Sequence, residues 1–345
     1  MVRALATVCL LLFARGASAD SGPRLVGARA TALAGAFTAV ADDSAAFYWN
    51  PAGIVHGSLI RGGFYGGTSF QDRNELVERL RSEVPSDGSV LEGGPSLGFS
   101  TSFTAFGVAV SHFTETDTFL EGTTLTSRGL ETLDVTMTIV QSLPVDVLTL
   151  GANVNVIRGT AFEQQAPAAS VPPSDRNVSD LFEGATSSDG RAETEIGLDA
   201  SVLYQPRDWI RVGLMGRNLT RPTFHTPSNE EIVRDRHARA GVAFMKDPGW
   251  LVAIDFDLTS RDAPELAKTM PSWRELALGA EKQWGDRRVA LRGGVRSELA
   301  DGALRRPGFS IGVGVRIAML IVDVGGITST ERRQGGVWLG LSLTR

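Results

Sequence analysis

Apolar and polar residues alternate along most of the chain from residue 58 onward. Around residues 148–156 and 195–204 every second position is apolar, and the positions between them are polar or glycine, except for Leu203. Successive side chains of a β-strand point to opposite faces, so this period of two indicates strands with one oily face and one polar face. We therefore predict an all-β protein.

The alternation predicts fourteen strands whose connections alternate in length. Short turns at 104–105, 144–146, 206–209, 247–249, 285–287 and 318–319 separate longer loops at 71–93, 121–130, 163–190, 219–236, 260–272, 298–305 and 330–333. An even number of strands with short turns at one end and long loops at the other is typical of an antiparallel transmembrane β-barrel. We expect strands over 58–70, 94–103, 106–120, 131–143, 147–162, 191–205, 210–218, 237–247, 250–259, 273–284, 288–297, 306–317, 320–329 and 334–343.

Charged residues within these strands fall on the polar face. In a β-sandwich or a β-solenoid, the alternatives for this pattern, that face would be solvent-exposed surface. In a barrel it is the lumen, where opposite charges pair across strands. The lumen network that we expect comprises Glu195, Asp199, Arg211, Arg239, Asp255, Asp257, Arg288, Arg292, Arg316 and Asp323.

The segment 27–54, rich in alanine and glycine, precedes the first strand. Leu33, Phe37 and Val40 have helical spacing, and we expect Asp42, Asp43 and Ser44 to cap a further turn that ends before Pro51. An ordinary surface helix is the alternative. A barrel of fourteen strands leaves a lumen that needs an occupant, so we predict that residues 20–57 form a plug, or hatch, inside a barrel of residues 58–345. Its aromatic residues are candidate ligand contacts: Phe37, Phe47, Tyr48 and Trp49.

The N-terminus has the features of a secretory signal peptide. Arg3 is followed by an apolar run and by Ala17-Ser18-Ala19, which predicts cleavage after residue 19. The only cysteine, Cys9, lies in this leader, so the mature chain has no disulfide. Without Arg3 and Arg15 it has 32 basic and 39 acidic residues, a net charge of −7, which gives no reason to expect a nucleic-acid partner.

Residues that carry chemistry in other proteins form no convincing site here. Asp255 and Asp257 share a strand face and could form a catalytic carboxylate pair, but lumen arginines make a salt-bridged structure the better interpretation. The four histidines have no ligand spacing, so we predict no metal and no cofactor. Ser111 and His112 are neighbours on one strand and point to opposite faces, so we predict no enzyme.

The hatch segment carries a family resemblance. Residues 35–43 followed by Tyr48-Trp49-Asn50-Pro51-Ala52-Gly53 resemble the signature of the FadL and toluene-transporter family of outer-membrane proteins and of its TraF-like and PorV-like relatives. The resemblance implies a fourteen-stranded barrel in the outer membrane of a Gram-negative bacterium, surrounded by outer-membrane lipids. It also implies passive uptake of hydrophobic molecules of the fatty-acid or aromatic-hydrocarbon class. It assigns hatch or gating roles to Asp42, Asp43, Asn50, Pro51, Ala52 and Gly53.

The same resemblance leaves a second function open. Some TraF-like and PorV-like relatives serve secretion or conjugation machinery, which implies a protein partner and a scaffold or shuttle role. Outer-membrane assembly machinery is a further expected partner, although the chain ends in Leu343-Thr344-Arg345 and not in the aromatic residue that this machinery commonly reads. In the loops, Leu76, Leu80, Val84, Val171, Val178, Leu181 and Phe182 could collect an oily ligand or could simply pack the loops together.

Overall fold

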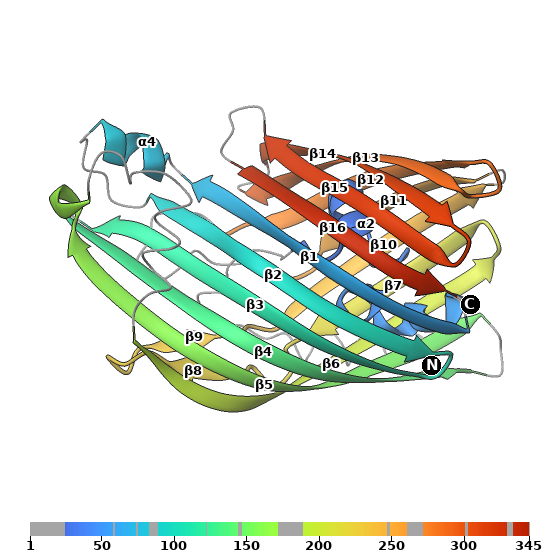
Figure 1. Cartoon of the computed structure of the whole chain (residues 1–345), viewed down its shortest axis with the longest axis horizontal. Coiled ribbons are helices and arrows are strands. Elements are labelled where there is room, and N and C mark those ends of the chain that lie inside the picture. The colour runs from blue at the N-terminus through green and yellow to red at the C-terminus, as the bar shows by residue number, and fades with distance from the viewer. Residues whose placement is uncertain are drawn as a thin grey trace.

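The strands close into one antiparallel barrel in the computed structural model (Figure 1). The structure describes residues 25–57, 59–73, 75–82, 89–121, 123–143, 147–171, 189–246, 249–260, 272–300, 303–329 and 334–344. Within these ranges, fourteen strands are hydrogen-bonded in the order β1-β16-β15-β14-β13-β12-β11-β10-β7-β6-β5-β4-β3-β2. This confirms the predicted fourteen-stranded barrel with short helices at its N-terminal end. The predicted signal peptide, residues 1–19, lies outside the described residues.

The elements follow one another with short turns at one end and long loops at the other. They are α2 (Ala28–Ala32), α3 (Ala46–Trp49), the 3₁₀ helix η1 (Pro51–His56), β1 (Ile60–Arg73), α4 (Leu76–Arg81), β2 (Val90–Phe103), β3 (Phe106–Glu121), β4 (Thr124–Ser142), β5 (Leu148–Pro167), η2 (Ala168–Ser170), β6 (Gly190–Arg207), β7 (Ile210–Arg217), β8 (Thr223–His225), β9 (Glu231–Val233), β10 (His237–Lys246), β11 (Trp250–Asp257), β12 (Arg274–Trp284), β13 (Val289–Ala300), β14 (Ala303–Ile317), β15 (Leu320–Ser329) and β16 (Gln334–Thr344).

The two faces of the wall differ as the alternation predicts. In β5, Val154 and Val156 are exposed on the outer face, whereas Asn153 and Asn155 are buried on the inner face. In β14, Ile311 is 66% exposed. A water-soluble protein rarely exposes a continuous apolar belt of this kind, so the outer face is suited to an apolar medium.

Two differences from the predicted strands concern the long-loop end. β4 and β5 extend beyond their predicted limits, and from Leu130 of β4 and Ile157 of β5 toward this end the pattern reverses, with both residues buried inside the barrel. They form an inner cluster with Phe224 and Ile232 of a two-stranded hairpin, β8–β9, in the stretch that we predicted as a loop. The Arg234 guanidinium beside this hairpin donates to the Asp134 carboxylate of β4 at 2.9 Å. The loop therefore folds against the inner wall.

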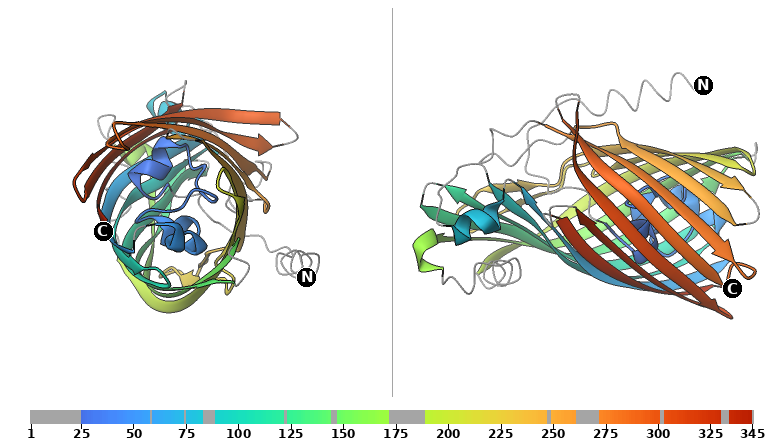
Figure 2. Two further views of the ribbon diagram at one scale, coloured as in Figure 1. Left: turned by 90° about the vertical axis from the view of Figure 1, so that its right-hand side faces the viewer. Right: turned by 90° about the horizontal axis from the view of Figure 1, so that it is seen from above.

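The hatch, residues 25–57, lies within the ring of strands, in the half of the barrel nearer the short turns (Figure 2). Its first helix differs from the prediction, because α2 ends at Ala32 and the residues with helical spacing, Leu33, Phe37 and Val40, lie outside a helix. Ala34 and Gly35 adopt positive φ angles of 57° and 85°, which end the helix. None of the helices in the described part of the chain is long and apolar enough to cross a membrane.

Inward-facing glycines of the wall provide the space for the hatch. A Cβ atom at Gly325 of β15 would lie 2.2 Å from the carbonyl oxygen of Ala28, and one at Gly213 of β7 would lie 2.4 Å from that of Thr38. Comparable contacts with hatch atoms occur at Gly151, Gly279, Gly294 and Gly312. We call this set the glycine seat. It allows the hatch backbone to touch the strand backbones directly.

The long loops pack on one another through the apolar residues that the sequence placed on one helical face. Leu76 and Leu80 of α4 are buried with Leu91, Leu120 and Leu125, and Val171 packs against the same cluster. Here the packing interpretation holds. The remaining predicted loop residues, Val84, Val178, Leu181 and Phe182, lie outside the described residues.

We expect Gly325→Ala to displace the hatch, because the added methyl group meets backbone that cannot move aside. Overpacking of this kind costs about 1–3 kcal/mol. The folded barrel should melt at a lower temperature in detergent, and its conductance in a planar bilayer should rise toward that of a variant lacking residues 25–57.

The neighbouring Gly326→Ala is the matched control, since the nearest atom to its added Cβ is 3.5 Å away. Equal melting temperatures and conductances for the two variants would contradict the glycine seat.

Candidate functional site in the barrel lumen

Asn50 joins three parts of the structure at one fully buried amide. Its Nδ2 group donates to the carbonyl oxygens of Thr38 at 2.8 Å and of Val202 in β6 at 3.3 Å, and its Oδ1 accepts from the Ala52 amide at 3.1 Å. As predicted, Asn50 itself is extended, with φ of −169°, and the next helix begins at Pro51. Asn50 therefore ties the two halves of the hatch to the wall.

The other residues of the Asn-Pro-Ala-Gly turn also dock closely. The Ala52 amide donates to the Ser201 hydroxyl of β6 at 3.1 Å. A Cβ atom on Gly53 would lie 1.8 Å from the Ala41 carbonyl oxygen, so only glycine fits there. The structure thus brings Asn50, Pro51, Ala52 and Gly53 together as one docking turn.

A first charge network holds the middle of the hatch. The Asp255 carboxylate accepts hydrogen bonds from the amides of Phe37 at 3.0 Å and Thr38 at 2.8 Å. The Arg239 guanidinium binds Asp255, Asp257 and Glu275 at 3.0–3.2 Å and also donates to the Gly35 carbonyl oxygen. The pair Asp255 and Asp257 is therefore salt-bridged, and Asp255 directly binds hatch backbone.

A second network holds the helix end of the hatch. Arg29 of α2 donates to Glu281 of β12 at 2.8 Å and to Asp42 at 2.6 Å. Arg292 of β13 donates to the same Glu281 at 2.5 Å and to Asp323 of β15 at 2.6 Å. These contacts join the hatch to three strands of the wall through alternating charges.

Of the remaining predicted lumen charges, Arg211 reaches the second network, with its guanidinium 4.0 Å from the Asp42 carboxylate. Asp199 accepts hydrogen bonds from Asn153 and Asn155, and Asn153 also donates to the Phe47 carbonyl oxygen. Arg211 donates to the Val40 carbonyl oxygen at 3.4 Å. Glu195 is half-buried, and two arginines are exposed at the short-turn mouth: Arg288 and Arg316.

The two hatch aspartates have opposite electrostatic surroundings. Burial would raise the pKa of Asp42, but Arg29, Arg211 and Arg61 outweigh it and hold that pKa below its ordinary value. Burial raises the pKa of Asp43, because Arg29 opposes this only in part and the Asp42 charge adds to it. Asp43 accepts a hydrogen bond from the Ala45 amide at 2.8 Å in the turn before α3, and Asp42 binds Arg29. The N-cap residue of α3 is Ala45 and no side chain caps it, so the predicted side-chain cap of this helix by Asp42, Asp43 or Ser44 is wrong.

The hatch aromatics pack as a core. Phe37 and Trp49 make an edge contact, Phe47 stacks on Tyr65 of β1, and the Arg217 guanidinium lies 3.6 Å from the centre of the Tyr48 ring. Trp49 donates from Nε1 to the Val26 carbonyl oxygen at 2.8 Å. The candidate ligand residues Phe37, Phe47, Tyr48 and Trp49 do not line the small cavity beside the hatch.

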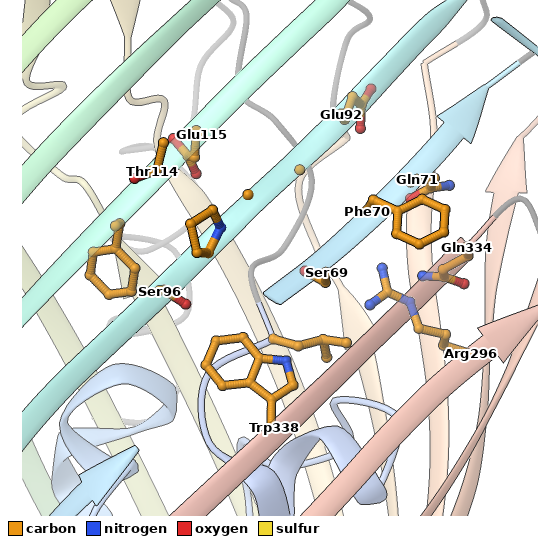
Figure 3. A pocket seen from close by; sticks show the side chains of 15 residues that line it. Ser69, Phe70, Gln71, Glu92, Ser96, Thr114, Glu115, Arg296, Gln334 and Trp338 are labelled. Atoms are coloured by element: carbon orange, nitrogen blue, oxygen red, sulfur yellow. The ribbon is translucent and has the colours of Figure 1, made fainter. Parts of the chain in front are cut away.

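A small cavity of about 60 Å³ lies instead between the hatch and strands β1, β2, β3, β13 and β16 (Figure 3). Leu25, Phe70, Phe113 and Trp338 supply apolar lining, and Glu92, Glu115, Arg296 and Gln334 are among its polar residues. The Trp338 indole nitrogen is buried and has no hydrogen-bond partner among the described residues. The sequence interpretation did not single out these residues.

The wall is irregular beside this cavity. β2 pairs with β3 up to Gly93 opposite Thr116 and again from Ser96 opposite Phe113, which leaves Gly94 and Pro95 unpaired with β3. Gly93 and Gly94 have φ angles of 148° and 153°, and proline has no amide to donate. In the sequence, the Gly-Gly-Pro cluster could have indicated this irregularity, because glycine and proline inside a strand mark a bulge or a close approach of another group.

Ser111 and His112 lie on opposite faces of β3. The Ser111 hydroxyl is buried in the lumen and accepts a hydrogen bond from Tyr65, whereas His112 contacts Glu131 on the outer face at 2.7 Å. They cannot act on one another. No group of three or more potential metal ligands is present in the part of the chain that the structure describes.

The surroundings of Asp42 and Asp43 predict opposite effects of neutralising them. The stabilising contribution of Asp42 is complete above an ordinary aspartate pKa of about 3.9 and is lost as the pH falls through its lowered folded-state pKa. Asp43 stabilises the fold in its protonated form, and this contribution is lost as the pH rises through its raised pKa. At pH 7 we expect Asp42→Asn to destabilise the detergent-solubilised barrel by about 1–3 kcal/mol and Asp43→Asn to stabilise it slightly.

Melting curves followed by near-ultraviolet circular dichroism at pH 7 and pH 3 check this expectation. The difference between wild type and Asp42→Asn should shrink at pH 3. An Asp42→Asn variant that is as stable as wild type at pH 7 would contradict it.

Comparisons with known proteins place this architecture among known barrels. The sequence family described as "F plasmid transfer operon, TraF, protein" matches residues 86–257. No curated protein sequence matches the chain.

Solved structures with the same fold cover nearly all of the chain. The CymD monoaromatic hydrocarbon channel is 14% identical with a TM-score of 0.56, and covers 92% of this chain and 96% of its own. The P. putida toluene transporter TodX is 11% identical with a TM-score of 0.59 and coverages of 92% and 98%. A Pseudomonas aeruginosa FadL homologue is 11% identical with a TM-score of 0.61 and coverages of 94% and 99%.

The family match and the shared architecture agree with the hatch motif and with the observed strand order. At these identities the solved structures show the fold, and the family match covers about half of the chain. On these findings together, the chain is a FadL-like, TraF-like β-barrel protein.

Proposed function

We propose that the chain is an outer-membrane channel for passive uptake of hydrophobic small molecules, gated by its hatch. The observation that carries the proposal is the cavity with apolar lining between the hatch and the stretch of β2, Gly94 and Pro95, that does not pair with β3. The names of the similar structures, which include hydrocarbon channels and a toluene transporter, support the aromatic-hydrocarbon or fatty-acid class of ligand.

The outer face supports the membrane location. Trp209, Trp250 and Trp284 are each about half exposed near short turns, and the Lys282 ammonium lies 4.8 Å from the Trp250 ring centre. Exposed aromatics at the edge of an apolar belt are typical of a membrane–water interface. We propose further that residues 1–19 are a cleaved signal peptide and that the short-turn end of the barrel faces the periplasm.

The hatch contacts favour a local gate. The middle of the hatch is tied to the wall at Asp255, and its helix end at Glu281, so removing the hatch as a whole would expose many buried charges. The part of the hatch that lines the small cavity is Leu25, and a movement confined to it would leave these contacts in place. We keep the gating role that the family resemblance gives to Asp42, Asp43, Asn50, Pro51, Ala52 and Gly53, and we assign the ligand passage to the small cavity. We propose no catalytic role.

We expect Ser96→Phe to block uptake, because Ser96 is a buried residue of β2 that lines the small cavity. A phenyl ring would occupy most of the about 60 Å³ that is open there. Uptake of radiolabelled toluene by cells that depend on this protein should fall about tenfold, while the amount of folded barrel in the outer membrane stays the same.

Ser102→Phe is the control, because Ser102 lies on the same strand and does not line the cavity. Equal uptake by Ser96→Phe and Ser102→Phe cells would argue against this passage. If wild-type cells take up toluene and a long-chain fatty acid no faster than cells without the protein, the transport proposal fails.

The TraF family match favours one second function, a scaffold or shuttle in a secretion or conjugation assembly. The outward loops would then bind a protein partner through α4 and the ends of β4 and β5. We expect crosslinking at the exposed Arg81 of α4 in intact cells to capture a defined partner, with crosslinking at Trp284, on the outer face near a short turn, as the control. Recovery of the same proteins from both positions would count against this role.

A further inference from the structure

A larger cavity of about 370 Å³ opens at the short-turn end of the barrel, apart from the small cavity to which we assign the ligand passage. Its wall residues belong to β1, β12, β13, β14, β15, β16 and the turn before β13, and the hatch contributes Arg29, Asp42, Asp43, His56 and Gly57. Six arginines and three aspartates line it. We call it the basic vestibule.

Two of these six arginines are already paired with carboxylates. Arg29 binds Glu281 and Asp42, and Arg292 binds Glu281 and Asp323. The charges of these two arginines are therefore compensated, and the two side chains hold the hatch against the wall. The spare positive charge must therefore come from other residues of the vestibule.

Arg288 and Arg316 face each other across neighbouring strands. The Arg316 amide donates to the Arg288 carbonyl oxygen at 2.7 Å, and the adjacent residues Val289 and Val315 are register partners. Like charges directly opposite each other in a sheet destabilise it. Neither side chain has a carboxylate within 4.0 Å among the described residues. An anion between them would turn this repulsion into attraction.

Arg61 adds a third cation, and it is buried. Its side chain lines the vestibule and is 7% exposed, and its Nη1 donates to a neutral acceptor, the Asp42 carbonyl oxygen. Its Nε is buried with no hydrogen-bond partner among the described residues. A buried guanidinium without its full set of acceptors is costly, so this donor indicates a missing ligand.

We propose that the basic vestibule binds a phosphate group, held by Arg61, Arg288 and Arg316. A phosphate monoester carries a charge of about −1.5 to −2 at neutral pH and three strong acceptor oxygens, which matches three spare guanidinium groups better than one carboxylate does. Guanidinium groups bind phosphate through paired N–H donors. The group belongs either to free inorganic phosphate or to the head group of a lipid at the membrane surface.

Titration calorimetry on the full chain in an uncharged detergent tests the site. The probes are inorganic phosphate, dihexanoyl phosphatidic acid and, as a phosphodiester without net charge, dihexanoyl phosphatidylcholine. We expect phosphate or phosphatidic acid to bind and phosphatidylcholine not to bind. Arg288→Gln and Arg316→Gln should each weaken binding about tenfold through loss of a charge-assisted hydrogen bond.

Arg207→Gln is the matched control, because Arg207 is exposed at the same end of the barrel and does not line the vestibule. If inorganic phosphate and phosphatidic acid bind with similar affinity, the site is assigned to free phosphate. If phosphatidic acid alone binds, it is assigned to a lipid head group. The proposal is overturned if neither probe binds to wild type, or if Arg207→Gln weakens binding as much as Arg316→Gln does. Because Arg288 and Arg316 are exposed, both variants should fold, and toluene uptake should not change in either.

Discussion

The contact between the Asp255 carboxylate and the backbone amides of Phe37 and Thr38 is the interaction on which the lumen depends. Backbone amides buried in a barrel and left without an acceptor cost about 1–3 kcal/mol each. Asp255 removes that cost, but without Arg239 its carboxylate would be an isolated buried charge. Arg239 also binds Asp257, Glu275 and the hatch carbonyl oxygen of Gly35. The hydrogen bonds of Asp255 with the two amides and of Arg239 with Gly35 form only when the hatch is seated. The polar interior and its occupant therefore stabilise each other.

The sequence predicted the wall well because one physical requirement repeats along it. Side chains facing the outside must be apolar and those facing the lumen can be polar, so a period of two marks every wall strand and places Asp255 and Asp257 on the inner face. The same rule explains where the prediction stopped. Beyond Leu130 and Ile157 the strands leave the apolar belt, the phase reverses and the β8–β9 hairpin covers the inside. That hairpin was predicted as a loop.

The hatch was harder to predict because contacts distant in sequence determine its shape. Leu33, Phe37 and Val40 have helical spacing, yet Phe37 and Thr38 donate to a carboxylate 217–218 residues away and are not free to continue a helix. By contrast, Pro51 sets the extended backbone of Asn50 locally, so this turn could be predicted. The same distinction separates Asp43, which binds the Ala45 amide two residues further on, from Asp42, which binds Arg29. The small cavity combines residues from five strands and the hatch, and no single segment of sequence carries that combination.

The positions of the seat glycines also bear on how the molecule is assembled. The first hatch helix rests on Gly312 and Gly325, which belong to β14 and β15 near the end of the chain, while the hatch itself leads directly into β1. β1 pairs with β16 to complete the ring. The surface on which this helix packs is therefore incomplete until β14 and β15 have joined the wall. Closure of the barrel between β1 and β16 and docking of the hatch in the lumen therefore belong to one step of assembly, without an intermediate that is closed and empty.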